Sequence, residues 1–366
     1  MRHLEDDPVE IGGAPVVTLR RPAPSDPGKP AFLSARIVPG RGMMTLQITA
    51  HLPERGEFDL LASPPLDEAR RILEDDSGGF AGNGTYLIGG GILAPFANRI
   101  RGELSSDGRT VRTHIGGRPV DLPANHGGRR PGAEKYSMHG LILASRVDEM
   151  SRETTEERDV LRGSLQAGDF GGSWVSSAAL EFENILTSDS FTLKVTATNT
   201  GDSPLPMGIG WHPYFNLPSG RREQARLHLP AHGRALVNDY DEVLPTGEVE
   251  PVAGTPYDFS MPGGRQLGDL ALDDCFVDLE RSNGEVAAEV VDPAGSFGLR
   301  VVAASPPVAA IQIYAPPDKG FVVVEPQFNR ADPFGPQWAG VDTGMAILQP
   351  GESVVYSARL ELFTPE

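Results

Sequence analysis

The sequence predicts an all-β protein built as one large, mostly antiparallel β-sandwich, and three observations lead to this class. Short segments of alternating apolar and polar residues recur along the chain, which is the period of a strand with one buried face. The 43 Gly and 33 Pro among 366 residues are spread widely, so turns are frequent and the elements between them are short. Helical periodicity is nearly absent, which favours antiparallel sheets over alternating strands and helices.

The elements are expected in the following order. Residues 1–34 show little periodicity and are predicted to form an N-terminal arm or edge segment, followed by a single domain over residues 35–366. Met44 to Ala50 alternates as a strand, and Leu66 to Glu74, preceded by two prolines, is the one predicted helix. Phe191 to Asn199 is the clearest half-exposed strand. Further strands are expected at 160–165, 180–186, 286–291, 299–302, 309–314, 321–324 and 353–363.

Charge and cysteine content exclude several classes of protein. The chain has 32 Lys and Arg against 50 Asp and Glu, a net charge of −18, which would repel a nucleic-acid backbone. No stretch of the sequence reaches the 18 apolar residues that would predict a membrane-spanning helix, and the acidic N-terminus does not resemble a secretory signal. Cys275 is the only cysteine, so no intramolecular disulfide is expected. We therefore expect a cytoplasmic protein with neither nucleic acid nor membrane as a partner.

Several common catalytic and cofactor motifs are missing. The chain has no phosphate-binding G-x-x-x-x-G-K-[ST] loop and no G-x-S-x-G elbow, and the glycines at 89–91 lack the dinucleotide-binding spacing. Cys275 lies in an apolar run and is predicted to be a buried, inert thiol. His228 and His232 are four residues apart, but Pro230 between them prevents a helix that would pair them on a metal. These motifs therefore support neither a nucleotide-binding site nor a metal site at the histidine pair.

Four segments place ionisable groups beside aromatic or apolar residues. The first contains Asn98 and Arg99, the second His139 followed by a glycine, and the third His212 among aromatic residues. In the fourth, Glu325 ends a continuous apolar strand. A carboxylate in such a strand is rarely buried unless it is partnered or functional, so Glu325 is the strongest individual signal.

The order of these segments, together with Leu272 to Phe276 between the third and the fourth, resembles the aldose 1-epimerase (galactose mutarotase) family from about residue 35 to 363. The resemblance implies a large, mostly antiparallel β-supersandwich with the sugar in an open cleft and no cofactor. It also implies that His212 is the general acid, Glu325 the general base, and that four residues bind the sugar hydroxyls and orient the ring: Asn98, Arg99, His139 and Asp273. Asp273 is favoured over Asp274 because Phe276 follows it by three residues, as the family pattern requires.

These residue types suit the interconversion of α and β anomers of a free aldohexose. The reaction removes a proton from the C1 hydroxyl and delivers one to the ring oxygen, so one base and one acid suffice. Histidine carries a proton near neutral pH, and a carboxylate can accept one. The expected partner is therefore a small-molecule sugar, bound by a monomer or a homodimer.

Three alternatives stay open. A hexose-6-phosphate epimerase would need a cationic pocket, to which Arg101, Arg129 and Arg130 could contribute. A non-catalytic carbohydrate-binding sandwich would share the fold but would need no acid and base. A glycoside hydrolase would need two carboxylates flanking the bond, and only one stands out. Trp211 and Pro213 beside His212, and Leu141 after the His-Gly pair, differ from the better-known galactose-type members, so the preferred sugar is open.

Overall fold

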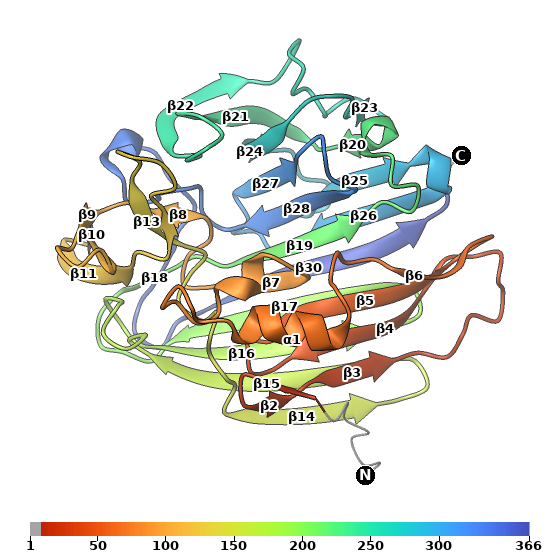
Figure 1. Ribbon diagram of the computed structural model, residues 1–366, viewed down its shortest axis with the longest axis horizontal. Helices are drawn as coiled ribbons and strands as arrows, with labels where there is room; N and C mark the ends of the chain where they lie inside the picture. The colour runs from red at the N-terminus through yellow and green to blue at the C-terminus, as the bar shows by residue number, and fades with distance from the viewer. Residues whose placement is uncertain (1–8, 366) are drawn as a thin grey trace.

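The structure, a computed structural model, describes residues 9–365 and contains two large antiparallel sheets packed face to face (Figure 1). The alternation predicted from the sequence explains the packing, because each sheet turns one row of apolar side chains toward the other. The nine-stranded sheet is, in order, β14 (Glu149–Thr154), β15 (Asp159–Gly168), β16 (Ala178–Leu186), β17 (Ser190–Asn199), β30 (Ser353–Phe363), β26 (Phe297–Ala303), β25 (Val286–Asp292), β20 (Arg226–His228) and β23 (Arg265–Gln266).

The second sheet has eleven strands and carries the candidate site. It runs β22 (Pro245–Pro251), β21 (Ala231–Val237), β24 (Leu272–Leu279), β27 (Ala310–Ala315), β28 (Phe321–Gln327), β19 (Gly210–Asn216), β7 (Gly90–Leu93), β5 (Met44–Leu52), β4 (Ala31–Val38) and β3 (Val17–Arg20), with β6 (Gly56–Asp59) paired to β5. All of its pairs are antiparallel, so neighbouring strands can come from distant parts of the chain.

Small sheets complete the fold. They are β1 (Glu10–Ile11) with β2 (Ala14–Pro15); β9 (Glu103–Leu104), β10 (Thr110–Ile115) and β11 (Arg118–Pro123); β8 (Arg99–Ile100), β12 (His126–Gly127) and β13 (Lys135–Met138); and β18 (Leu205–Met207) with β29 (Ala346–Leu348). Short 3-10 turns are η1 (Asn83–Tyr86), η2 (Arg222–Gln224), η3 (Pro293–Gly295) and η4 (Pro336–Trp338). The sheet of β8, β12 and β13 lies beside the ends of β27 and β28 (Figure 1).

The predicted elements are confirmed. The helix α1 spans Leu66–Glu74, as expected, and buries Ala69 and Leu73. Each predicted strand overlaps an observed one, with bounds that differ by a few residues, as for 309–314, which is observed as β27 at Ala310–Ala315. Strand β17 alternates residue by residue between buried and half-exposed side chains. No helix within residues 9–365 is long and apolar enough to cross a bilayer.

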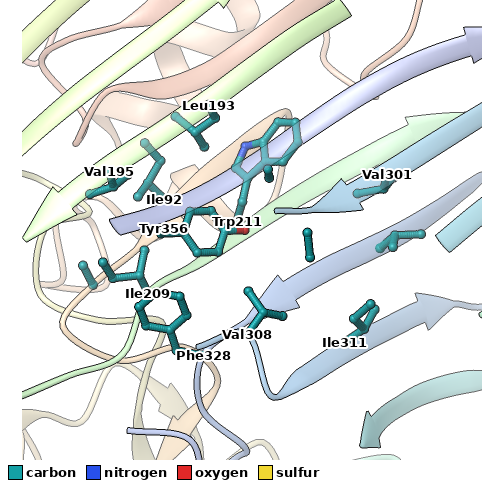
Figure 2. Close-up of a cluster of buried hydrophobic side chains, with 14 of the residues drawn as sticks. Ile92, Leu193, Val195, Ile209, Trp211, Val301, Val308, Ile311, Phe328 and Tyr356 are labelled. Atoms are coloured by element: carbon teal, nitrogen blue, oxygen red, sulfur yellow. The ribbon is translucent and has the colours of Figure 1, made fainter. Parts of the chain in front are cut away.

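The main core fills the space between the two large sheets (Figure 2). Leu193, Val195 and Tyr356 come from the nine-stranded sheet, and Trp211 and Ile311 come from the eleven-stranded sheet, all fully buried. Burying one such side chain contributes about 1.5–3 kcal/mol. The two sheets are therefore held as one unit, which fixes the positions of the residues on their outer faces.

The N-terminal region includes an edge of the eleven-stranded sheet. Residues 1–8 of the predicted arm lie outside the described residues, whereas β3 is the last strand of that sheet and pairs with β4. Ile11, Val16 and Val17 are buried. The described part of this segment is thus packed on the domain.

Candidate active site

The outer face of the eleven-stranded sheet gathers polar side chains from four neighbouring strands. Successive residues of a strand point to opposite faces, so Trp211 enters the core while His212 faces away from it. Gly210 pairs with Gln327 and Tyr214 with Val323, and this register places His212 opposite Glu325. Glu325 in turn pairs with Gln312. The sequence brings these groups together because strands far apart in the chain are neighbours in the sheet.

His212 and Glu325 touch each other. The imidazole Nε2 lies 3.3 Å from Oε1 of Glu325, and the side chains are 7% and 2% exposed. Burial lowers the pKa of His212 to about 4. Burial also raises the pKa of Glu325 well above its ordinary value, and the nearby Asp273 adds to this rise. Burial therefore favours the neutral form of each group over its charged form.

Asn98 and Arg99 project from the start of β8. Asn98 has φ of +62°, a left-handed conformation that asparagine tolerates better than most residues. Its Oδ1 accepts a hydrogen bond of 2.7 Å from Nη1 of Arg99, and its Nδ2 donates one of 3.1 Å to Oε1 of Gln312. Arg99 is 5% exposed and lies over the ring of Tyr136 at 5.7 Å. Both predicted ligands are therefore fixed by their neighbours.

A ring of four side chains connects this segment to Asp273 on β24. Arg99 donates to Asn98, Asn98 donates to Gln312, and Nε2 of Gln312 donates to Oδ1 of Asp273 at 2.7 Å. Nη2 of Arg99 lies 3.8 Å from Oδ2 of the same carboxylate, which closes the ring. Asp273 is the most exposed of these groups, at 22% of its side chain, so the network is reached by solvent from its side.

Asp274 is engaged elsewhere. Its side chain is 1% exposed, accepts a hydrogen bond of 2.8 Å from Nη1 of Arg234 and another from the hydroxyl of Tyr240. It points to the opposite face of β24 from Asp273, as adjacent strand residues do. Asp274 therefore pairs with Arg234 and Tyr240, whereas Asp273 joins the Arg99 network.

His139 lies between the Arg99 segment and His212. Its backbone N–H donates to the carbonyl of Asn98 at 2.8 Å, and its ring meets that of His212 edge-on with centroids 4.9 Å apart. Gly140 follows it with φ of +86°, and a Cβ there would lie 2.3 Å from the carbonyl oxygen of Ala94. Only glycine fits this close approach, which explains the His-Gly pair in the sequence.

Several buried polar atoms of the site have no hydrogen-bond partner among residues 9–365. They are Nδ1 and Nε2 of His139, Nδ1 of His212 and Oε1 of Gln327. Burial also lowers the pKa of His139 well below its usual range, and His212 and Arg99 lower it further. An unsatisfied buried polar atom costs about 1–3 kcal/mol, and such atoms in one place indicate a ligand that supplies the missing bonds.

Aromatic rings line the same region. The ring of Tyr214 stacks on His212 with centroids 4.9 Å apart, and Tyr86 lies 5.1 Å from His139. Tyr314 and Phe321 contact Tyr214 edge-on and are half-buried. Such rings can contact the apolar face of a sugar. Two cavities elsewhere in the described residues, of about 370 and 360 Å³, are lined by none of the six predicted site residues.

Two further sequence predictions concern the lone cysteine and the histidine pair. Cys275 is buried, as expected, and burial raises the pKa of its thiol to about 12. His228 lies on β20 and His232 on β21, in different sheets, and no group of three or more metal-ligating residues occurs in the described part of the chain.

Comparison with known proteins decides the family. Residues 71–361 match the family model described as aldose 1-epimerase. The chain belongs to the aldose 1-epimerase family. A maltose epimerase from Levilactobacillus brevis is 28% identical over 61% of this chain and 63% of its own length. Human galactose mutarotase is 30% identical over 50% of this chain and 49% of its own length. The alignments thus span about half to three-fifths of these curated relatives.

Solved structures show the same fold over nearly the whole epimerase-family chain. A galactose mutarotase-like protein from Clostridium acetobutylicum has a TM-score of 0.70 at 17% identity and covers 92% of this chain and 93% of its own. A galactose 1-epimerase from Lactobacillus acidophilus has a TM-score of 0.67 at 17% identity, with 97% and 96% coverage. The likeness confirms the predicted mutarotase-like β-sandwich.

Sequence reasoning missed three polar or aromatic members of the site. Gln312 joins Asn98 to Asp273, Gln327 donates to Oε2 of Glu325 at 2.9 Å, and Tyr214 stacks on His212. Gln312 interrupts an apolar strand, which is the same signal that singled out Glu325. A consistent search for polar residues within apolar strands would have found it.

Proposed function

We propose that this family member is a mutarotase that interconverts the α and β anomers of a free, neutral hexose. The observation that carries the proposal is the buried contact of 3.3 Å between His212 and Glu325, a proton donor and a proton acceptor on facing positions of two strands. The unsatisfied nitrogens of His139 beside them, and the Arg99–Asp273 network on the other side, supply the groups that a hydroxyl-rich ligand needs.

The reaction follows from this pair. Glu325 takes the proton of the C1 hydroxyl while His212 gives a proton to the ring oxygen; the bond from C1 to that oxygen breaks and C1 becomes a carbonyl. Rotation about the bond from C1 to C2 exposes the other carbonyl face, and the reverse transfers close the ring. The protonated imidazole and ionised carboxylate differ from the resting neutral pair by one proton moved across the contact. Sugar hydroxyls that hydrogen-bond to the charged forms favour that transfer.

The raised pKa of Glu325 strengthens it as a base, since a carboxyl tuned toward neutrality accepts a proton more readily. Arg99 and Asp273 orient the sugar through its hydroxyls, and His139 holds the ring beside His212. Fixing the reacting atoms in this way lowers the entropic part of the barrier. Tyr214 and Tyr314 limit where the ring can lie.

Polarimetry tests the proposal directly. Freshly dissolved α-glucose, α-galactose and a reducing disaccharide such as maltose should approach their equilibrium rotation faster with the protein than without it. Glu325→Gln should remove the acceleration while sugar binding, followed by calorimetry, persists. A non-catalytic carbohydrate-binding sandwich would bind sugar yet leave the rate unchanged in the unaltered protein.

The surroundings of the arginines favour a neutral sugar over a phosphorylated one. Arg101 pairs with Glu134, and Arg130 pairs with Asp239 and Asp241, so both cations are already balanced by carboxylates. Arg129 contacts the ring of His126 at 3.1 Å. We expect glucose 6-phosphate to be a poorer substrate than glucose, and a higher kcat/KM for the phosphate would overturn this choice.

A further inference from the structure

The chain that leaves β28 returns at once to the segment that carries Asn98 and Arg99. Asn329, four residues after Glu325 and 0% exposed, uses its side-chain amide like a strand backbone. Its Oδ1 accepts a hydrogen bond of 3.1 Å from the N–H of Ala97, and its Nδ2 donates one of 2.9 Å to the carbonyl of the same residue. One side chain thereby holds both backbone polar groups of Ala97.

Asp332 holds the other end of that segment. Its backbone N–H donates to the carbonyl of Arg99 at 2.6 Å, and its Oδ1 accepts a hydrogen bond of 2.9 Å from the N–H of Arg101. Oδ2 accepts a further bond of 2.9 Å from Nε2 of Gln337, and the side chain is 3% exposed. Gln337 therefore holds the carboxylate of Asp332, and the carboxylate in turn holds the backbone N–H of Arg101.

The held segment includes a strained residue. Asn98, with its positive φ, lies between Ala97 and Arg99, and its carbonyl accepts a bond from the N–H of His139. A residue kept in this conformation costs about 1–3 kcal/mol unless its surroundings hold it there. Room for the side chain of Asn329 also depends on Gly208, where a Cβ would lie 2.0 Å from Oδ1 of Asn329.

We propose that Asn329 and Asp332 are positioning residues, which fix Asn98 and Arg99 relative to Glu325. Strand β28 supplies Glu325, and the segment that follows β28 supplies Asn329 and Asp332, here together called the clamp. The base and the hydroxyl-binding arginine therefore keep one spacing although 226 sequence positions separate them (325 − 99). Both residues hydrogen-bond to the backbone of the segment from Ala97 to Arg101 and act through it. This inference rests on the proposed mutarotase function.

The first experiment compares Asn329→Ala and Asp332→Ala with a matched control. Asn199→Ala is that control, because Asn199 is also a buried amide, 1% exposed, that bonds backbone groups of Ser203 and Leu348, away from the site. All three variants should lose stability in urea unfolding. Only the clamp variants should lose kcat/KM, by about 10- to 100-fold, since small misplacement of a binding group has effects of that size. Equal kcat/KM in clamp and control variants would overturn the proposal.

A double-mutant cycle with Arg99→Ala separates positioning from general structural damage. If Asp332 acts through Arg99, adding Asp332→Ala to Arg99→Ala should lower kcat/KM by less than about twofold more, because the position it fixes no longer matters. A full additional loss would overturn the proposal. Asp332→Asn keeps an oxygen for the N–H of Arg101 and should restore most of the activity lost in Asp332→Ala, even where Asn329→Ala does not fold.

Amide hydrogen exchange gives a readout that does not need activity. Exchange at Ala97 should accelerate in Asn329→Ala, and exchange at Arg101 should accelerate in Asp332→Ala, whereas Asn199→Ala should leave both unchanged. If the unaltered protein accelerates no sugar but these amides respond, the clamp stands and the proposed function fails. Unchanged exchange at both amides in the clamp variants overturns the clamp itself.

Discussion

Strands β17 and β28 each turn alternate side chains toward the core, yet their second faces differ: β17 alternates between buried and half-exposed residues, whereas β28 is buried at nearly every position. On β17, Leu193 and its apolar neighbours enter the core while Lys194 and Thr196 are half-exposed. On β28, Val324 enters the core, but Glu325 and Gln327 on the other face are buried as well, at 2% and 0% exposure. Water can solvate the polar face of β17, whereas the polar face of β28 depends on partners within the protein. A strand that buries polar groups on its second face therefore marks the candidate site.

The largest effect should come from the face that carries Glu325 on β28 and His212 on β19, here called the covered face because its polar groups are buried. His212→Asn removes the proposed acid and should lower the polarimetric kcat by about 100- to 10,000-fold, the usual range for a general acid or base. His228→Asn, on β20 of the other large sheet, is the control and should leave the rate unchanged. Comparable losses in both variants would show that the covered face has no special role.

The core face of β17 should determine stability without affecting chemistry. Leu193 is fully buried between the sheets, so Leu193→Ala should lower the free energy of unfolding by about 2–5 kcal/mol. Urea unfolding measures this loss. The rate per folded molecule should stay within about twofold of the unaltered protein, because residues that are far apart and share no partners usually act independently. A larger drop would mean that Leu193 also positions the site.

The pH dependence of stability should show the cost of burying Glu325. Burial raises the pKa of Glu325 in the folded state, so this carboxyl ionises at a lower pH in the unfolded chain than in the folded protein. As pH rises from the ordinary carboxyl range to the folded pKa, the unaltered protein therefore loses stability. Glu325→Gln does not titrate. In urea unfolding at pH 8, its free energy of unfolding should therefore exceed that of the unaltered protein by about 1.4 kcal/mol for each unit of pKa shift. This advantage should shrink toward pH 4.

A higher stability of Glu325→Gln at pH 8 would sharpen the contrast between β17 and β28. A carboxylate that stabilises the folded state would instead make the Gln variant the less stable protein at pH 8. If Glu325→Gln were less stable at pH 8 than at pH 4, relative to the unaltered protein, the carboxylate would be ionised and stabilising in the folded state. The same measurement on Glu181→Gln, which changes an exposed carboxylate of β16, serves as the surface control.

The smallest effect should come from the polar face of β17. Thr196→Val changes a half-exposed side chain away from the site, so its effect on the free energy of unfolding should stay within about 0.5 kcal/mol. Polarimetry should show an unchanged rate. A clear loss of activity would mean that the half-exposed face also contributes to the site, and the comparison with β28 would fail.

Much of the fold followed from local patterns. The helix from Leu66 to Glu74 and strands such as 191–199 were predicted because apolar spacing and flanking turn residues act over a few positions. The site was harder, because its residues come from six segments. Glu325 could be singled out by its place in an apolar strand, whereas Gln312 was missed and the clamp of Asn329 and Asp332 has no local pattern at all.

The sequence by itself determined the strand period, the absence of helical layers and the residue types able to move a proton, because these depend on neighbours in the chain. The family resemblance named His212 and Glu325 as partners, but only the tertiary structure decided that they touch and that both are buried. Strand order in a sheet places residues 113 positions apart (325 − 212) on facing sites, and burial then changes their pKa values. Those effects arise from packing between distant segments, which no local pattern contains.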